Sequence, residues 1–162
     1  MLSAYFSHPI RGSKVANATT ADIEENCKHC SEVARQIEQE TGIKLYIPAA
    51  HDEVINMAYN HGHITERGIL EADCRILAKR DFVLAYARDG HVSRGMKVEI
   101  EHALAVEKSV FLFGRWDEGA IAAFKHFYLS LSNHPLHRHH INGLYGGVAS
   151  GLIAHNYLTE IE

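Results

Sequence analysis

A chain of 162 residues, of which 46% are hydrophobic, is long enough for one domain with a buried core. Its formal net charge of −4 argues against binding to nucleic acid polymers or to an acidic membrane surface, and no apolar run approaches the ~20 residues that span a bilayer. Because no basic leader precedes an apolar stretch, we expect a cytoplasmic protein that acts on a small molecule.

Short apolar strands alternate with helical patterns along the chain. Pro9 and Pro48 close strands because proline cannot donate to a ladder, and Gly42 closes a helix that begins near Asp22, with Glu25 placed as at a capped start. In chain order, the predicted elements are a strand at 2–7, a loop at 8–20, a helix at 22–41, a strand at 43–47, a helix at 52–60, a helix capped by Thr65 that includes 69–77, a strand at 81–87, a helix at 95–107, a strand at 109–113, and helices at 118–131 and 144–158.

Strands that alternate with helices indicate a parallel sheet covered on both faces. We therefore predict an α/β fold, a single-domain, three-layer, Rossmann-like sheet of about four to five parallel strands formed by the whole chain, 1–162. Ligands of such sheets bind beyond the carboxyl ends of the strands. The stretches expected there are 7–13, 48–53, 88–95 and 114–117.

The C-terminal helical part, residues 118–158, carries more apolar surface than one sheet face needs. We expect this part to lie at the interface of a homodimer or a higher homo-oligomer. Its apolar residues are Phe124, Phe127, Tyr128 and Leu131 in the first helix and Leu144, Val148, Leu152 and Ile153 in the second.

The turn and helix that follow the most hydrophobic strand carry the strongest chemical pattern. A helix start presents free backbone N–H groups and a positive dipole end, which suit a phosphate. Ser93 adds a hydroxyl at this start, and Gly95 allows a ligand to approach the backbone closely.

Glu99 lies one turn further along the same helix. At about 100° per residue it falls inside the apolar arc of Met96 and Ile100 rather than on the polar face. A carboxylate there is costly unless it is hydrogen-bonded or used, so we predict that Glu99 attacks the anomeric carbon of a bound sugar. The alternative is a paired or snorkelling glutamate at the edge of an amphipathic stripe, as Glu107 near the same arc illustrates.

Two clusters invite a metal or redox interpretation that we do not adopt. Cys27 and Cys30 form a CxxC inside a helical pattern, where packing is the favoured role. The histidines of 134–140 lie in a loop without the fixed geometry of a metal site, and we interpret them as a solvated or interface loop. We predict no metal site and no cofactor. His51, just past Pro48, is a better candidate, as a contact to a base or sugar.

Three features occur in a characteristic order: Y-F-S-H-P-I-R-G at 5–12, Asp73, and S-x-G-x-x-x-E-x-x-x-A at 93–103. In this order and spacing they resemble the nucleoside 2-deoxyribosyltransferase superfamily, and within it most closely the 2′-deoxynucleoside 5′-phosphate N-hydrolase branch. The resemblance covers roughly residues 1–113. Transferases of the superfamily often carry an acid where this chain has Ser93, so serine favours a nucleotide over a bare nucleoside.

The resemblance implies a retaining double displacement in which Glu99 attacks C1′ and expels the base, and water or a second base resolves the glycosyl ester. Tyr5 would orient Glu99, and Asp73 would contact the leaving base or the sugar. A 5′-phosphate would be held by Arg11, Gly12, Ser93 and the amides around Gly95.

Each implied residue also has an ordinary structural alternative. Taken alone, Tyr5 fits a strand aromatic, Arg11 a solvated loop cation and Asp73 a helix-surface acid. The chain departs from the hydrolase branch at His8 and Pro9, which replace a small glycine and serine. We expect His8 to contact the substrate and to reshape the base pocket.

The sequence thus predicts an enzyme that hydrolyses the N-glycosidic bond of a (deoxy)nucleoside 5′-monophosphate and releases free base and sugar phosphate. A base-exchanging deoxyribosyltransferase and a non-catalytic nucleotide sensor on the same fold are the alternatives. Cleavage of NAD or another ribonucleotide by the same carboxylate also stays open, as does the identity of the base.

Overall fold

The computed structural model describes residues 2–133 and 141–145. Its elements are β1 (Ser3–Ser7), α1 (Thr20–Thr41), β2 (Lys44–Tyr46), α2 (Asp52–Asn60), α3 (Glu66–Ala78), β3 (Phe82–Tyr86), α4 (Arg94–Ala105), β4 (Ser109–Phe113), α5 (Glu118–Asn133) and β5 (Ile141–Tyr145), with short 3₁₀ turns at Gly12–Asn17, Pro48–His51 and Arg88–Gly90.

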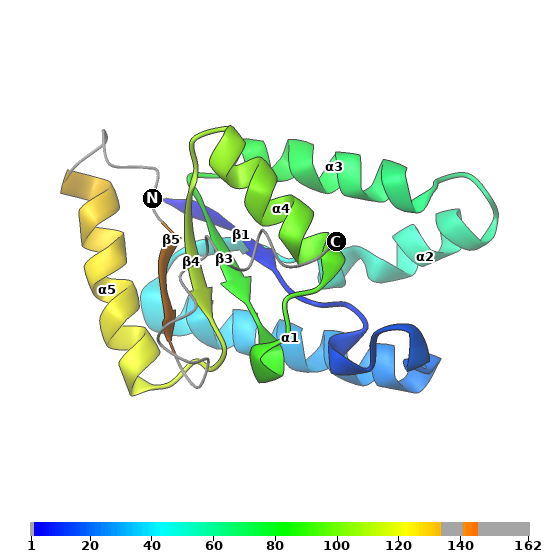
Figure 1. Ribbon diagram of the computed structural model, residues 1–162, viewed down its shortest axis with the longest axis horizontal. Helices are drawn as coiled ribbons and strands as arrows, with labels where there is room; N and C mark the ends of the chain where they lie inside the picture. The colour runs from blue at the N-terminus through cyan, green and yellow to red at the C-terminus, as the bar shows by residue number, and fades with distance from the viewer. Residues whose placement is uncertain (1, 134–140, 146–162) are drawn as a thin grey trace.

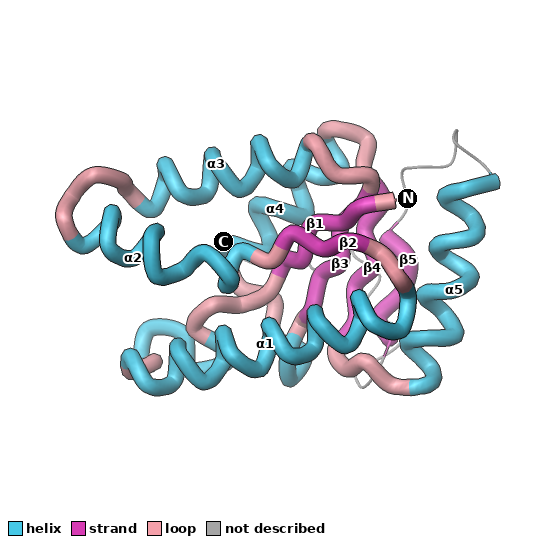
Figure 2. The backbone as a smooth tube through the Cα atoms, turned by 180° about the vertical axis from the view of Figure 1, so that it is seen from behind, coloured by secondary structure: helices cyan, strands magenta, loops and turns pink. Residues whose placement is uncertain are grey.

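The strands form one parallel sheet in the order β2-β1-β3-β4-β5. Helices cover both faces, with α3 and α4 on one and α1 and α5 on the other (Figures 1 and 2). This confirms the predicted three-layer, Rossmann-like α/β architecture. Within the described ranges, no helix combines the length and the apolar content that crossing a membrane requires.

Side chains of β1, β3 and β4 alternate between two separate cores. Tyr5, Val83 and Val110 belong to the core beneath α3 and α4, whereas Phe6 and Phe111 belong to the core beneath α1 and α5. Because neighbouring residues of a strand point to opposite faces, the sequence of β1 alone divides its side chains between the two sides of the sheet.

Helix ends follow the expected chemistry with one correction. Gly42 has φ +71° and ends α1 in the left-handed conformation, as predicted. The N-terminal cap of α1 is Thr19 rather than Asp22, and it forms a capping box with Asp22 as the third helical residue. Glu25 takes no part in that box.

The C-terminal prediction is wrong at its start. Residues 144 and 145, predicted as helix, belong to β5, which pairs in parallel with β4. The ladder satisfies the backbone groups of an otherwise open edge strand, and this long-range gain outweighs local helical spacing. The remainder of the predicted helix, 146–158, and the histidine loop at 134–140 lie outside the described residues.

The apolar residues of α5 that were expected to be surplus are used within the chain. Phe124 and Phe127 are buried in the core beneath α5, and Tyr128 and Leu131 pack against it. Leu129, with 57% of its surface exposed, is the large hydrophobic residue that α5 leaves outside.

Candidate active site

The strand order reverses around β1, since the chain passes from β1 outward to β2 and then returns to β3 on the other side of β1. In open α/β sheets the loops after two such strands diverge, and the crevice between them is the usual ligand site. By this rule, the ligand site of this sheet is expected beyond Ser7 of β1 and Tyr86 of β3.

The carboxylate of Glu99 meets two hydroxyl groups from β1. Tyr5 donates to Oε1 at 2.7 Å, and Ser7 donates to Oε2 at 2.5 Å. Strand alternation places both donors on the face that α4 covers, two residues apart, and both are fully buried. Glu99 itself is 7% exposed, so the predicted burial against Tyr5 is confirmed.

Burial dominates the electrostatics of Glu99. It raises the pKa of this carboxyl from an ordinary 4.5 to about 7, while the hydrogen bonds from Ser7 and Tyr5 act in the opposite direction and the negative charge of Asp73 adds to the rise. Burial and the same two carboxylates raise the pKa of Tyr5 far above its ordinary value. Tyr5 therefore stays protonated, and a hydrogen-bond donor, at neutral pH.

Asp73 completes the predicted trio. It lies on α3, is 8% exposed, and is close enough for its charge to raise the pKa values of Glu99, Tyr5 and Tyr46. The structure thus brings together Tyr5, Asp73 and Glu99, which come from three different elements and span most of the first hundred residues.

Aromatic rings extend from this trio toward the surface. The ring of Tyr46 stacks on Tyr5 with centroids 5.7 Å apart, and the ring of His51 stacks on Tyr46 at 5.2 Å. His51 is exposed, so its position near the rim suits the predicted contact to a base or sugar. The sequence prediction did not include Tyr46.

The start of α4 lies one turn from Glu99. Ser93 caps the helix by accepting a hydrogen bond from the Met96 amide at 3.3 Å. Among the residues that the structure describes, a Cβ added to Gly95 would meet only the Ser93 hydroxyl, at 3.9 Å, so these residues leave space beside the backbone there. The N–H groups and the positive dipole end of such a helix start suit an anion.

Two residues of the predicted phosphate loop lie at the rim. Arg11 is exposed, and its guanidinium is 3.6 Å from Glu66 at the start of α3. Gly12 has φ +56°, a conformation that favours glycine. The structure therefore pairs the predicted phosphate ligand Arg11 with an exposed glutamate.

His8 lies on the other side of the sheet from Glu99. Its ring is 6% exposed and 5.7 Å from the ring of Phe6, and neither ring nitrogen has a hydrogen-bond partner in the described part. Burial lowers its pKa to about 4, so the ring is neutral at physiological pH. Strand alternation turns residue 8 away from residues 5 and 7, and the substrate contact by His8 stays a prediction.

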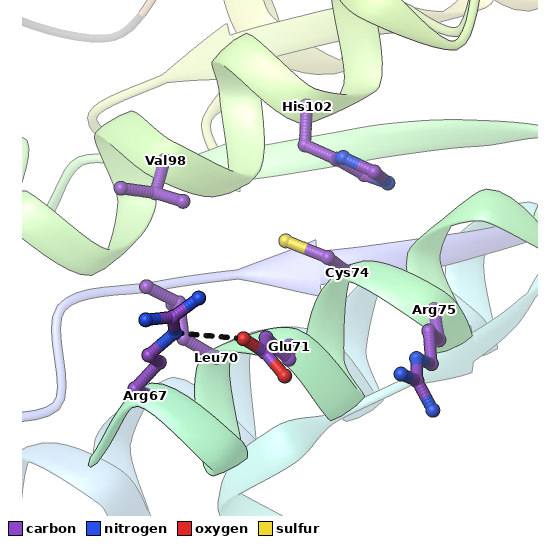
Figure 3. Close-up of a pocket in the computed structure, with 7 residues that line it drawn as sticks. All are labelled: Arg67, Leu70, Glu71, Cys74, Arg75, Val98 and His102. Atoms are coloured by element: carbon purple, nitrogen blue, oxygen red, sulfur yellow. Dashed lines mark hydrogen bonds and ion pairs between the residues drawn. The ribbon is translucent and has the colours of Figure 1, made fainter.

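A separate pocket of about 370 Å³ opens between α3 and α4 (Figure 3). Cys74 lies at its centre, and burial together with the charges of Glu99 and Asp73 raises the pKa of the thiol. The pocket is therefore close to the buried trio but does not contain it. Its lining residues are Arg67, Leu70, Glu71, Cys74, Arg75, Val98 and His102.

Comparison with protein-family models, with curated proteins and with solved structures finds no match to this chain. Within the described residues, no group of three or more His, Cys, Asp or Glu side chains is placed to hold a metal ion.

Ser7 is the most important residue that sequence reasoning missed. It belongs to the Y-F-S-H-P-I-R-G motif, and the two-residue period of a strand already places it on the same face as Tyr5. This two-residue period is the sequence signal that could have identified Ser7 as a second partner of Glu99.

The raised pKa of Glu99 makes a prediction for stability. Because the folded chain holds this proton up to about pH 7 while the unfolded chain releases it near 4.5, Glu99 should lower the free energy of unfolding by about 3 kcal/mol as pH rises through that window. Glu99→Gln removes this dependence. Urea unfolding at pH 4.5 and pH 8 should therefore show the variant gaining stability relative to wild type at the higher pH. If the free energies of unfolding of wild type and Glu99→Gln differed by the same amount at both pH values, the raised pKa would be contradicted.

Proposed function

We propose that this protein is an N-glycosidase that hydrolyses a (deoxy)nucleoside 5′-monophosphate, with Glu99 as the nucleophile. The observation that carries the proposal is a buried carboxylate, held by the hydroxyls of Tyr5 and Ser7, one turn from an open helix start at the ligand edge of the sheet. The resemblance of the 5–12 and 93–103 motifs to the nucleoside 2-deoxyribosyltransferase superfamily supports the same reading.

The reaction proceeds in two displacements. In the first, an oxygen of Glu99 forms a bond to C1′ of the sugar, the C1′–N bond breaks, and its electron pair leaves with the base, which takes up one proton. In the second, water attacks C1′, the ester bond to Glu99 breaks, and a proton is released. The net reaction consumes one water and yields free base and sugar 5-phosphate.

The neighbours of Glu99 have distinct roles in this scheme. Tyr5 and Ser7 fix the carboxylate and counter the effect of burial on its pKa, so that an ionised nucleophile is present near neutral pH. Asp73 faces the leaving base or the sugar. The amides around Gly95 and the hydroxyl of Ser93 receive the 5′-phosphate, and Arg11 reaches it from the rim by leaving its exposed partner Glu66.

The proposal includes a cytoplasmic location and a homodimer or higher homo-oligomer. It includes no metal or other cofactor. The base-exchanging transferase and the non-catalytic nucleotide sensor are outcomes of the assay that follows, not separate proposals.

A base-release screen over ribonucleoside and deoxyribonucleoside monophosphates tests the reaction. Wild type should release free base, with kcat/KM falling below pH 7 as Glu99 is protonated. Glu99→Gln should keep the fold and lose on the order of 10³-fold or more in turnover. Glu101→Gln, which changes an exposed glutamate on the same helix, is the matched control and should turn over normally.

The outcomes of this screen separate the alternatives. Base exchange when a second free base is added indicates a transferase, which uses the same nucleophile. Nucleotide binding without base release by wild type would contradict the enzyme proposal and favour the sensor. Undiminished turnover by Glu99→Gln would contradict the role of Glu99.

Gly95→Ala separates substrate binding from stability. The added methyl has room in the folded chain and improves helix propensity, so the free energy of unfolding should stay equal or rise by up to about 1 kcal/mol. If the 5′-phosphate occupies the open space, KM should rise about tenfold or more. Gly119→Ala, at the equivalent second position of α5, is the control. An unchanged KM in Gly95→Ala would show that no ligand group occupies that space.

A further inference from the structure

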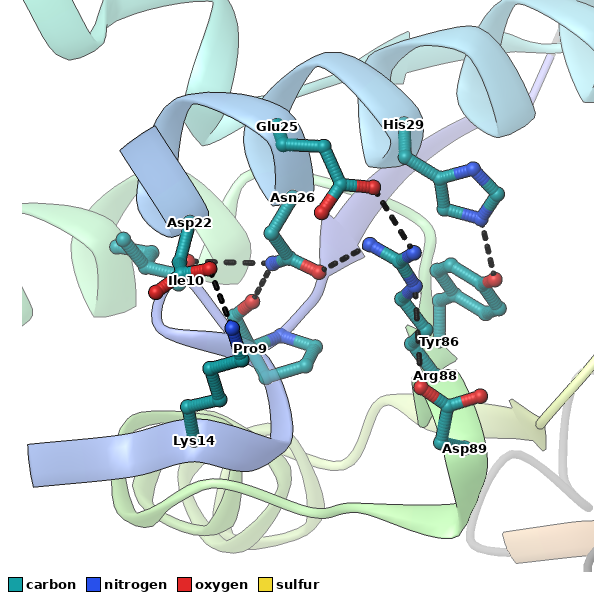
Figure 4. Close-up of polar contacts among 10 residues, drawn as sticks. All are labelled: Pro9, Ile10, Lys14, Asp22, Glu25, Asn26, His29, Tyr86, Arg88 and Asp89. Atoms are coloured by element: carbon teal, nitrogen blue, oxygen red, sulfur yellow. Dashed lines mark hydrogen bonds and ion pairs between the residues drawn. The ribbon is translucent and has the colours of Figure 1, made fainter. Parts of the chain in front are cut away.

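The loop after β1 is held from the side of the sheet opposite to Glu99. Asn26 of α1 is 3% exposed, and its amide nitrogen donates to the backbone carbonyls of Pro9 and Ile10, the latter at 3.1 Å (Figure 4). The Pro9 carbonyl also accepts a hydrogen bond from the Gly12 amide at 3.4 Å. One side chain thus holds the turn that joins Ser7 to Gly12.

Arg88 fixes the orientation of this amide. It follows β3, and its Nη1 donates to the Asn26 side-chain oxygen at 2.9 Å while its Nη2 pairs with Glu25 at 3.2 Å. A guanidinium only donates, so the oxygen of Asn26 must face Arg88 and the NH₂ group must face the loop carbonyls. Figure 4 shows Asn26 lying between the loop and the guanidinium.

Gly12 packs directly against the same side chain. A Cβ at this position would lie 3.3 Å from the Asn26 side-chain oxygen, and the φ of +56° already favours glycine. The hydrogen bonds of Pro9 and Ile10 and the packing of Gly12 therefore all involve the Asn26 side chain.

We propose that Asn26 is a positioning residue for substrate binding, which it serves by holding the 9–12 loop so that Arg11 and the loop backbone meet the 5′-phosphate. The identity of the substrate in this inference rests on the proposed function. That Asn26 holds the 9–12 loop does not depend on it. Arg88 acts one step further away, through Asn26.

Asn26→Asp tests the proposal with a change of one group. The aspartate keeps the acceptor that Arg88 requires and replaces the donor with an oxygen that faces two carbonyls. We expect faster hydrogen–deuterium exchange at the amides of residues 10–12 and a rise of about tenfold in KM for a 2′-deoxynucleoside 5′-monophosphate, the effect of losing roughly 1.4 kcal/mol of hydrogen bonding. The kcat should stay within about twofold, because the loop contacts the phosphate equally before and during reaction.

Two further variants keep the test decisive. Gln36→Glu makes the same amide-to-carboxylate change at an exposed position of α1, where Gln36 pairs with Glu40, and should leave loop exchange and KM unchanged. Arg88→Gln keeps Asn26 but removes the guanidinium that orients it. It should also speed amide exchange at residues 10–12 and raise KM, and it serves as the test variant if Asn26→Asp fails to fold.

Different results would overturn the role of Asn26 and the proposed function. Unchanged loop exchange in Asn26→Asp and Arg88→Gln, or a loss of kcat with unchanged KM, would overturn the role of Asn26. Absence of base release by wild type would overturn the proposed function and with it the phosphate role of the loop. In that case the exchange measurement still decides whether Asn26 holds the loop.

Discussion

The hydrogen bonds from Tyr5 and Ser7 to the Glu99 carboxylate determine the arrangement of this site. A buried carboxylate without partners costs several kcal/mol, whereas each hydrogen bond to a charged group returns about 1.5–3 kcal/mol. Because the donors lie two residues apart on β1 and the acceptor lies on α4, the interaction also fixes the helix against the strand. The same contacts that make the burial tolerable leave the carboxyl with a pKa of about 7, where it is half ionised at neutral pH.

The first strand serves two purposes because its side chains alternate. Tyr5 and Ser7 face α4 and bind the carboxylate, whereas Phe6 and His8 face α1 and fill the core. The loop that follows is fixed from the α1 side by Asn26 and leads to the rim where Arg11 lies. A short segment of chain therefore supplies core packing, the hydrogen-bond partners of Glu99 and one side of the candidate site.

Much of this arrangement follows from the sequence. Alternation of strands and helices predicted the layers, and helical spacing placed Glu99 among Met96 and Ile100, which are 1% and 5% exposed. Strand β5 was missed because it depends on pairing with β4, a long-range contact without a local pattern. The directions of the Arg11 and Asn26 side chains depend equally on residues far away in the chain, Glu66 for one and Arg88 for the other.

The most direct test of this account is a titration of the Glu99 carboxyl by ¹³C NMR, with the resonance assigned by comparison with Glu99→Gln. We predict an apparent pKa near 7 in the wild-type protein, well above the 4.5 of an ordinary glutamate. A resonance that titrates near 4.5 would mean that the carboxyl is solvated rather than buried beside Tyr5 and Ser7, and would contradict the account.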